Sequence, residues 1–176
     1  MKRLLVIIIC FLFTTNTFSQ NILIGGMIGF PTDNYAFSKN NKIENVALGF
    51  NVGFEQKLSK SFSAYGTLGI TLLDQKSVGD NSTIIPIMAG IKLNMGAGGF
   101  LPYLGAEIGY NIVSYNDFLG QDLTLKEPAI SGLLGFSLPL TSKISWDIHA
   151  KYNLVLTVFR SNSLLSINTG LAFSIN

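Results

Sequence analysis

The sequence predicts an all-β protein: an eight-stranded antiparallel up-and-down transmembrane β-barrel. Three observations lead to this prediction. Apolar and polar residues alternate along segments of about ten residues or more, the links between these segments are alternately short and long, and the chain is apolar without a second long hydrophobic run. Alternation at period two is typical of strands whose faces meet different surroundings, and a tilted strand of ~10 residues can cross a bilayer.

The first 19 residues have the layout of a secretory signal peptide. Lys2 and Arg3 precede an apolar run that ends at Phe13, and small residues lead to a cleavage site after Ser19. The apolar run is shorter than the ~20 residues that a membrane-spanning helix needs. We therefore expect residues 1–19 to be removed and residues 20–176 to form one outer-membrane β-barrel domain.

Removal of this segment changes the composition. Cys10 is the only cysteine, and it lies inside the apolar run, which disfavours a lipid anchor. Two of the 12 basic residues are lost with it, so the remainder balances the 10 acidic residues and leaves no basic footprint for nucleic acid. Charged residues make up 12% of the chain, against ~25% in soluble domains. The mean hydropathy of +0.41 without a membrane-spanning helix favours a membrane barrel.

Eight strand-like segments follow the signal segment. Tight turns alternate with longer polar links, which is the pattern of an up-and-down barrel with short turns at one end and loops at the other. The strands are expected at Asn21–Phe30, Val46–Leu58, Phe62–Leu73, Thr83–Met95, Phe100–Tyr115, Pro128–Leu140, Ile144–Val158 and Leu164–Ile175. The tight turns are Ser59–Ser61, Gly96–Gly99 and Thr141–Lys143, and the longer links are Pro31–Asn45, Asp74–Ser82, Asn116–Glu127 and Phe159–Ser163.

The alternation is clearest in Ile144–Val158, where Asp147, His149 and Lys151 alternate with apolar residues. If these three face the lumen, the charges of the other strands assign a polar inner face and an uncharged outer face throughout; the first strand fits least well, because Leu23 and Met27 fall inside. The inner set is Asn51, Glu55, Lys57, Thr67, Thr71, Lys92, Asn94, Glu107, Asn111, Asp147, His149, Lys151, Asn153, Ser166 and Asn168. In chain order the outer set is Leu48, Phe50, Val52, Phe54, Leu68, Ile70, Leu72, Ile85, Ile87, Ile91, Leu93, Leu104, Ile108, Ile112, Leu134, Phe136, Leu138, Ile167, Leu171, Phe173 and Ile175.

Glycines follow the same division. Only Gly26, Gly66 and Gly132 fall on the outer face, and the inner face carries Gly25, Gly29, Gly49, Gly53, Gly69, Gly90, Gly105, Gly109, Gly135 and Gly170. The interior of an eight-stranded barrel is barely wide enough for side chains, so large inner residues need small neighbours.

Outward aromatic residues gather toward the tight-turn end. Phe54, Phe62, Phe100, Trp146 and Phe173 occupy positions that suit an interfacial girdle. The competing interpretation is a soluble sandwich or a lipocalin-like barrel with the apolar set inside. The strand length, the girdle and the alternating link lengths together favour the membrane barrel.

Two segments carry a family resemblance. Ile85–Leu93 has a Pro-Ile step leading to Gly-Ile-Lys, and Pro102–Asn111 begins with a Pro-Tyr-Leu-Gly-Ala run. In these segments the chain resembles the outer membrane protein β-barrel domain family, of the OmpX and OmpA-transmembrane type. The resemblance implies location in the cell outer membrane, contact with its lipid and lipopolysaccharide, and insertion by the barrel assembly machinery. The chain departs from this type at its end, where Asn176 replaces a terminal aromatic residue.

The inner charges are candidate functional residues. We interpret them as a network of ion pairs and hydrogen bonds, because an unpaired charge in a narrow barrel is costly; the alternative is a gated proton or ion path. The network is expected to contain Glu55, Lys57, Lys92, Glu107, Asp147, His149 and Lys151.

No catalytic, cofactor or metal site is expected. Some eight-stranded barrels modify lipid A with a histidine followed two residues later by a serine, but Lys151 occupies that position after His149. A catalytic histidine would also need an oriented nucleophile at the lipid-facing surface, whereas His149 is expected to point inward. With a single histidine and no remaining cysteine, the chain has no metal-ligand set.

The function predicted from the sequence is a structural or surface-interaction role, with loops presented from a side-chain-filled barrel. A surface partner could bind through residues 31–45 and 116–127, which combine aromatic and charged side chains. The alternative is a small gated channel or a transporter of a small or hydrophobic solute, and an enzyme that modifies lipid A is the less favoured third.

Overall fold

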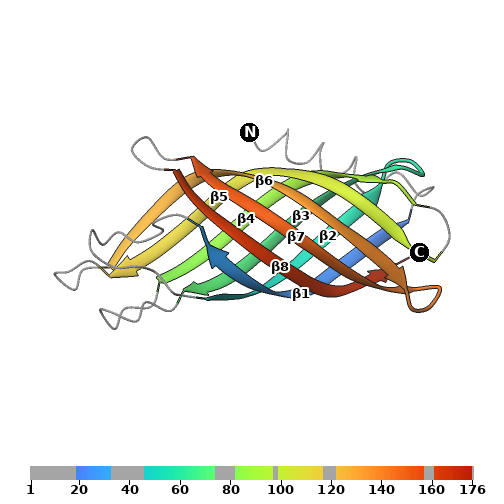
Figure 1. The fold of residues 1–176 in the computed structure, drawn as a ribbon, viewed down its shortest axis with the longest axis horizontal. Coiled ribbons are helices and arrows are strands. Elements are labelled where there is room, and N and C mark those ends of the chain that lie inside the picture. Colours follow the sequence, from blue (N-terminus) through green and yellow to red (C-terminus); the bar gives the residue numbers. More distant parts are fainter. Residues whose placement is uncertain are drawn as a thin grey trace, which may run out of the picture.

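The computed structural model describes residues 19–32, 46–73, 82–96, 99–116, 122–156 and 161–175, which form eight antiparallel strands closed into one barrel (Figure 1). Each strand pairs with its neighbours in the sequence, and β1 closes the barrel against β8. The predicted fold class and strand order are confirmed. The strands are β1 (Gln20–Pro31), β2 (Ala47–Lys57), β3 (Phe62–Leu73), β4 (Ser82–Asn94), β5 (Leu101–Asn116), β6 (Asp122–Pro139), β7 (Ile144–Leu156) and β8 (Ser161–Ser174).

Residues 1–18 of the predicted signal peptide and most of the predicted link 31–45 lie outside the described residues. In the part of the chain that is described, no helix has the length and apolarity needed to cross a membrane.

One predicted boundary is clearly wrong. Residues 116–127 were expected to form a loop, but Asn116 belongs to β5 and β6 begins at Asp122. β5 and β6 stay paired out to Asn116 and Asp122, beyond the last β4–β5 pair at Ser114 and the last β6–β7 pair at Ala129. The outer face of this extension carries Thr124 and Lys126, so the segment lacks the apolar alternation that marks a membrane strand.

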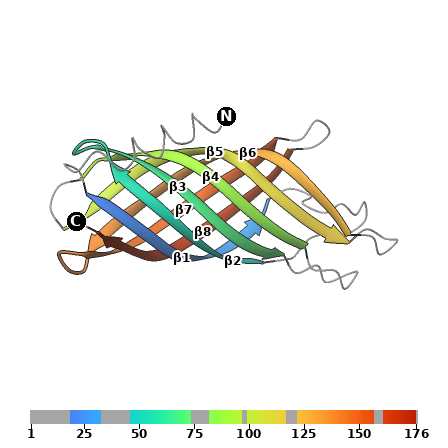
Figure 2. The same ribbon diagram turned by 180° about the vertical axis from the view of Figure 1, so that it is seen from behind.

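The strands are strongly tilted, as both views of the barrel show (Figure 2). A path of paired residues that starts at Asn21 returns to β1 at Pro31, ten residues farther along. This offset is the shear that links tilt to diameter in a closed barrel. The path runs Asn21, Glu55, Tyr65, Gly90, Glu107, Ser131, Asn153, Leu164, Pro31.

Two tight turns at one end of the barrel, the turn end, share one hydrogen-bonding arrangement. Leu58 N–H donates to the Phe62 carbonyl at 2.8 Å, and Leu140 N–H donates to that of Ile144 at 2.8 Å. The Ser59 hydroxyl accepts the N–H of Phe62 at 3.0 Å. Thr141 plays the same role in the other turn. Short hydroxyl side chains that accept backbone N–H groups favour such turns locally.

The barrel is polar inside and apolar outside. On the outer wall Ile108 is 68% exposed and Leu134 is 58% exposed, whereas Lys92 and Glu107 in the lumen are each 5% exposed. Leu23 and Met27 also lie on the inner side, as the alternation predicted. A continuous apolar wall of this kind has to be covered by lipid, because exposing so much apolar surface to water is unfavourable.

Inner and outer glycines serve different packing needs. A Cβ on Gly90 would lie 2.8 Å from Cζ of Tyr65, and a Cβ on Gly105 would lie 2.5 Å from Cδ1 of Leu133, so inner glycines make room for large neighbours. The three outer glycines each lie opposite an aromatic residue: Gly26 opposite Phe50, Gly66 opposite Phe54 and Gly132 opposite Tyr152. Aromatic rings opposite glycines stabilise strand pairs that would otherwise lack side-chain contact.

The inside-out arrangement predicts how a charge on the outer wall is tolerated. Ile108→Arg, in the middle of β5, should lower the free energy of unfolding in lipid vesicles by about 2–4 kcal/mol, because arginine is costly near the bilayer centre. Leu58→Arg, at an exposed position beside a tight turn, should cost about 0–1 kcal/mol. Urea unfolding in vesicles measures both. Equal and small effects would indicate that water, and not lipid, covers Ile108.

Candidate functional site: the filled lumen

The lumen is divided into layers along its axis. At the end opposite the turn end, the loop end, buried apolar side chains from six strands form a cluster against which Met27 packs. We call this cluster the apolar plug; it consists of Ala47, Leu73, Ile84, Val113, Val155 and Leu164. Toward the turn end the lumen is filled by charged, amide and tyrosine side chains. Two small cavities, of about 70 and 30 Å³, remain between these layers.

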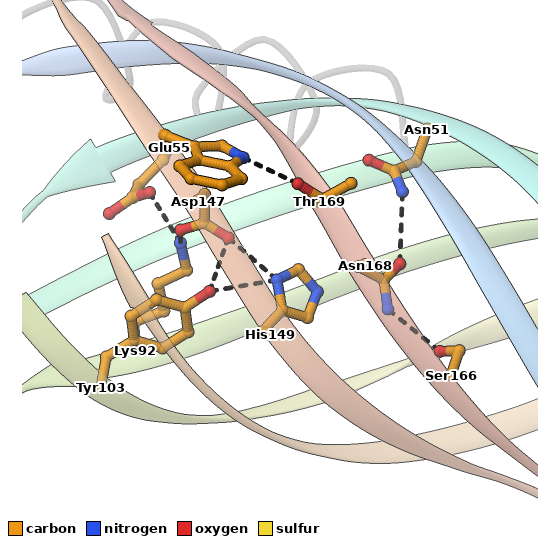
Figure 3. Close-up of polar contacts among 10 residues, drawn as sticks. Asn51, Glu55, Lys92, Tyr103, Asp147, His149, Ser166, Asn168 and Thr169 are labelled. Atoms are coloured by element: carbon orange, nitrogen blue, oxygen red, sulfur yellow. Dashed lines mark hydrogen bonds and ion pairs between the residues drawn. The ribbon is translucent and has the colours of Figure 1, made fainter. Parts of the chain in front are cut away.

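Lys92 on β4 is the centre of the charged layer (Figure 3). Its Nζ lies 3.1 Å from Oε2 of Glu55 and 3.6 Å from Oδ2 of Asp147. The same ammonium group lies 4.4 Å from the ring centroid of Tyr103 and 5.4 Å from that of Tyr65. Two carboxylates and two aromatic faces therefore replace the water that this buried cation would otherwise hold.

Asp147 joins this layer to His149. The Tyr103 hydroxyl donates to Oδ1 of Asp147 at 2.7 Å, and Nδ1 of His149 lies 2.9 Å from the same oxygen. The hydroxyl is also 3.1 Å from Nδ1 of His149 (Figure 3). Because Asp147 and His149 are two residues apart on β7, strand alternation points both side chains into the lumen.

A second ion pair lies deeper in the lumen. Nζ of Lys151 is 2.5 Å from Oε2 of Glu107, and the Glu107 side chain is 3% exposed. This contact gives the buried Glu107 carboxylate a charged partner. The pair joins β7 to β5 over the intervening strand β6.

Amide and hydroxyl groups fill the space beside this pair. Asn153 donates to the Ser131 hydroxyl at 3.0 Å and accepts from Asn111 at 3.4 Å. On the other side, Asn168 donates to Ser166 at 3.0 Å and accepts from Asn51 at 3.5 Å (Figure 3). Buried polar groups of this kind are favourable only when they find partners within the lumen.

The structure brings most of the expected charged residues together. Glu55, Lys92, Asp147 and His149 form one cluster, and Glu107 and Lys151 form a second. Lys57 joins neither by any ion pair and lies instead at the turn-end mouth. Tyr65 and Tyr103 are not among the residues predicted for the network, although Tyr103 stands in the Pro-Tyr run and lies on the same inward face of β5 as Glu107.

The five expected girdle residues lie on the outer wall. Phe62, Phe100 and Trp146 are exposed, and Phe54 and Phe173 are half-buried. Nε1 of Trp146 donates to the Thr169 hydroxyl at 2.8 Å, so the indole N–H has a hydrogen-bond partner on the outer wall. Phe136 packs on Phe100 with ring centroids 5.2 Å apart. That these residues form an interfacial girdle remains a prediction.

The lumen offers no evident metal centre. Among the described residues, no three histidine, cysteine, aspartate or glutamate side chains are grouped so that they could hold a metal ion. The acids of the charged layer are instead engaged with lysine, histidine and tyrosine. The polar side chains of the charged layer therefore connect the strands through ion pairs and hydrogen bonds.

No protein-family model matches the sequence, and no curated protein matches it. Solved structures do match the fold. Neisserial surface protein A is 14% identical, with 89% of this chain and 96% of that chain covered and a TM-score of 0.67. The attachment invasion locus protein Ail of Yersinia pestis is 16% identical, with coverage of 90% and 97% and a TM-score of 0.54. The N-terminal β-barrel domain of Pseudomonas aeruginosa OprF is 11% identical, with coverage of 89% and 100% and a TM-score of 0.52.

The fold is that of an outer membrane β-barrel. At these identities the likeness concerns the fold, and it agrees with the barrel type that the sequence resembled. The neighbouring chains are covered almost completely, so the likeness extends over the whole barrel and is not limited to one hairpin.

The charged layer predicts a distinctive mutational pattern. Lys92→Met should lower the free energy of unfolding by about 3–5 kcal/mol, because it leaves buried carboxylates without their cation. The triple variant Lys92→Met, Glu55→Gln, Asp147→Asn should recover most of this loss, since no charge is then left unpaired. Lys57→Met, which removes a lysine without an ion pair among the described residues, serves as control. Urea unfolding in vesicles would contradict the account if Lys92→Met and Lys57→Met behaved alike.

Proposed function

We propose that the protein is an integral barrel of the cell outer membrane with a structural or surface-interaction role, and that it presents loops from a side-chain-filled lumen. The observation that carries this proposal is the combination of an apolar outer wall with a lumen closed by the apolar plug and the charged layer. A barrel built in this way acts through its ends and its wall, because its interior has little free space.

The filled lumen argues against the transport alternative. A water-filled path would need a continuous opening, whereas the plug side chains Ala47, Val113 and Val155 are 0–2% exposed. The two cavities between the plug and the charged layer are of the size of a few water molecules. Opening a path would require separating the plug and breaking the ion pairs of Lys92 or Lys151.

The β5–β6 extension supports a surface interaction. β5 and β6 stay paired beyond the last described β6–β7 pair, at Ala129 and Val155. Thr124 and Lys126 on the outer face of this extension are exposed. A polar hairpin that continues past the other described strand pairs offers a surface to a partner at the loop end.

The names of two structural neighbours agree with a role at the cell surface. One is a Neisserial surface protein and the other is an attachment invasion locus protein. We therefore propose that a surface partner of this chain binds at the loop end, through the β5–β6 extension and the predicted loop 31–45. Residues 33–45 of that loop lie outside the described part of the chain.

Other partners follow from the proposed location. Outer membrane lipid and lipopolysaccharide would surround the apolar wall, and the barrel assembly machinery would insert the chain after the signal peptide is removed. No nucleic-acid partner is proposed, because the charges outside the signal segment balance.

We further propose that the protein is not an enzyme. His149 does have an acidic partner, Asp147, but the hydroxyl beside it belongs to Tyr103, which donates to that same aspartate. All three side chains lie in the lumen and away from the lipid-facing surface where a membrane lipid would have to react.

Truncation of the extension tests the surface role. Joining Val113 to Leu125 through Asn-Gly removes the tip while keeping a paired register position. Cells that display this variant should lose adhesion to one another and to cultured cell layers. The matched control joins Leu73 to Ser82 through Asn-Gly and shortens the β3–β4 link, and it should adhere normally. Heat-modifiable migration on gels verifies that both variants are folded. Unchanged adhesion in the Val113–Leu125 variant would refute the proposed surface.

A further inference from the structure

The turn end of the barrel opens into a cavity of about 190 Å³. We call it the vestibule. Its floor is the charged layer, with Glu55, Lys92, Tyr103 and Asp147, and Lys57 and Lys60 stand on its wall. It lies at the opposite end of the lumen from the apolar plug, so it can be reached only from the turn end.

The two kinds of charge in the vestibule are not equally engaged. Both floor carboxylates are already in contact with Lys92, and Asp147 also accepts from Tyr103. Lys57 and Lys60 make no ion pair with any acid in the described part of the chain. The floor carries two carboxylates against one ammonium group and the wall adds two ammonium groups, so three positive charges face two negative ones in the vestibule.

Neutral donors complete the lining. Ser137 and Ser145 lie on the wall formed by β6 and β7, and Asn94 lies on the β4 side with its amide held by a hydrogen bond of 3.2 Å to Ser63. Two lysines and several hydroxyl or amide groups around one concave space are the donor set that oxyanions require. A cation would meet three ammonium groups against two carboxylates, both of which already contact Lys92.

We infer that the vestibule is a binding site for a small polyvalent oxyanion, of the phosphate or carboxylate class, that enters from the turn end. Lys57 and Lys60 supply the charge, and the neutral donors hold the remaining oxygen atoms. If the loop end faces the cell exterior, as the proposed function requires, the turn end faces the periplasm. The vestibule is then separate from the surface that a partner would use at the loop end.

Nuclear magnetic resonance on the isotope-labelled barrel tests this inference. The protein is held in a sugar-headgroup detergent, which carries no phosphate, and is titrated with inorganic phosphate or citrate. Chloride at matched ionic strength controls for simple screening. Backbone amides around the vestibule should shift and saturate with phosphate or citrate. The anion that binds more tightly assigns the ligand to the phosphate or to the carboxylate class.

Variants identify the residues responsible. Lys57→Gln and Lys60→Gln should each weaken binding about fivefold, as expected for an ion pair that is open to water, and the double variant should weaken it further. Lys143→Gln is the matched control, because Lys143 lies in another turn at the same end without lining the vestibule. Unshifted heat-modifiable migration verifies folding. Equal amide shifts with chloride, or undiminished phosphate and citrate binding in the double variant, would overturn the inference.

Discussion

The narrow interior of an eight-stranded barrel in lipid is the constraint on which the rest of this structure depends. With a shear of ten residues, the lumen has room for side chains but not for bulk water. A charge buried in the middle of the lumen must therefore be compensated by another side chain. Lys92 shows the solution: one cation is shared by Glu55 and Asp147 and covered by two tyrosine rings.

The same constraint explains the distribution of glycine. Tyr65 reaches toward Lys92 from β3, and its ring occupies the space that a side chain at position 90 would need. Large polar residues and glycines in the lumen are therefore parts of one packing arrangement. On the outer wall lipid fills space freely, and the few outer glycines lie opposite aromatic residues instead.

The strand order and the facing of side chains could be predicted from the sequence because alternation at period two is a local property. Asp147 and His149 point inward for the same reason that Trp146 points outward. The alternation of short turns and longer links then predicted an up-and-down barrel, and the eight strands do close into one barrel.

The partners inside the lumen could not be predicted in the same way. Lys151 meets Glu107 over the intervening strand β6, which depends on the register of β6 against both of its neighbours and not on any spacing in the sequence. Tyr103 was missed because a tyrosine fits either face of a strand. The start of β6 was missed because an extension in water needs no apolar face, so Thr124 and Lys126 look like loop residues.

Conductance in planar lipid bilayers tests most directly whether the lumen is filled and closed. The account predicts that the wild-type barrel gives no steady open-channel current, because the apolar plug and the ion pairs of Lys92 and Lys151 leave no continuous water path. Protection of the strands from protease in the same lipid verifies insertion. A steady open-channel current from the inserted wild-type protein would contradict the account.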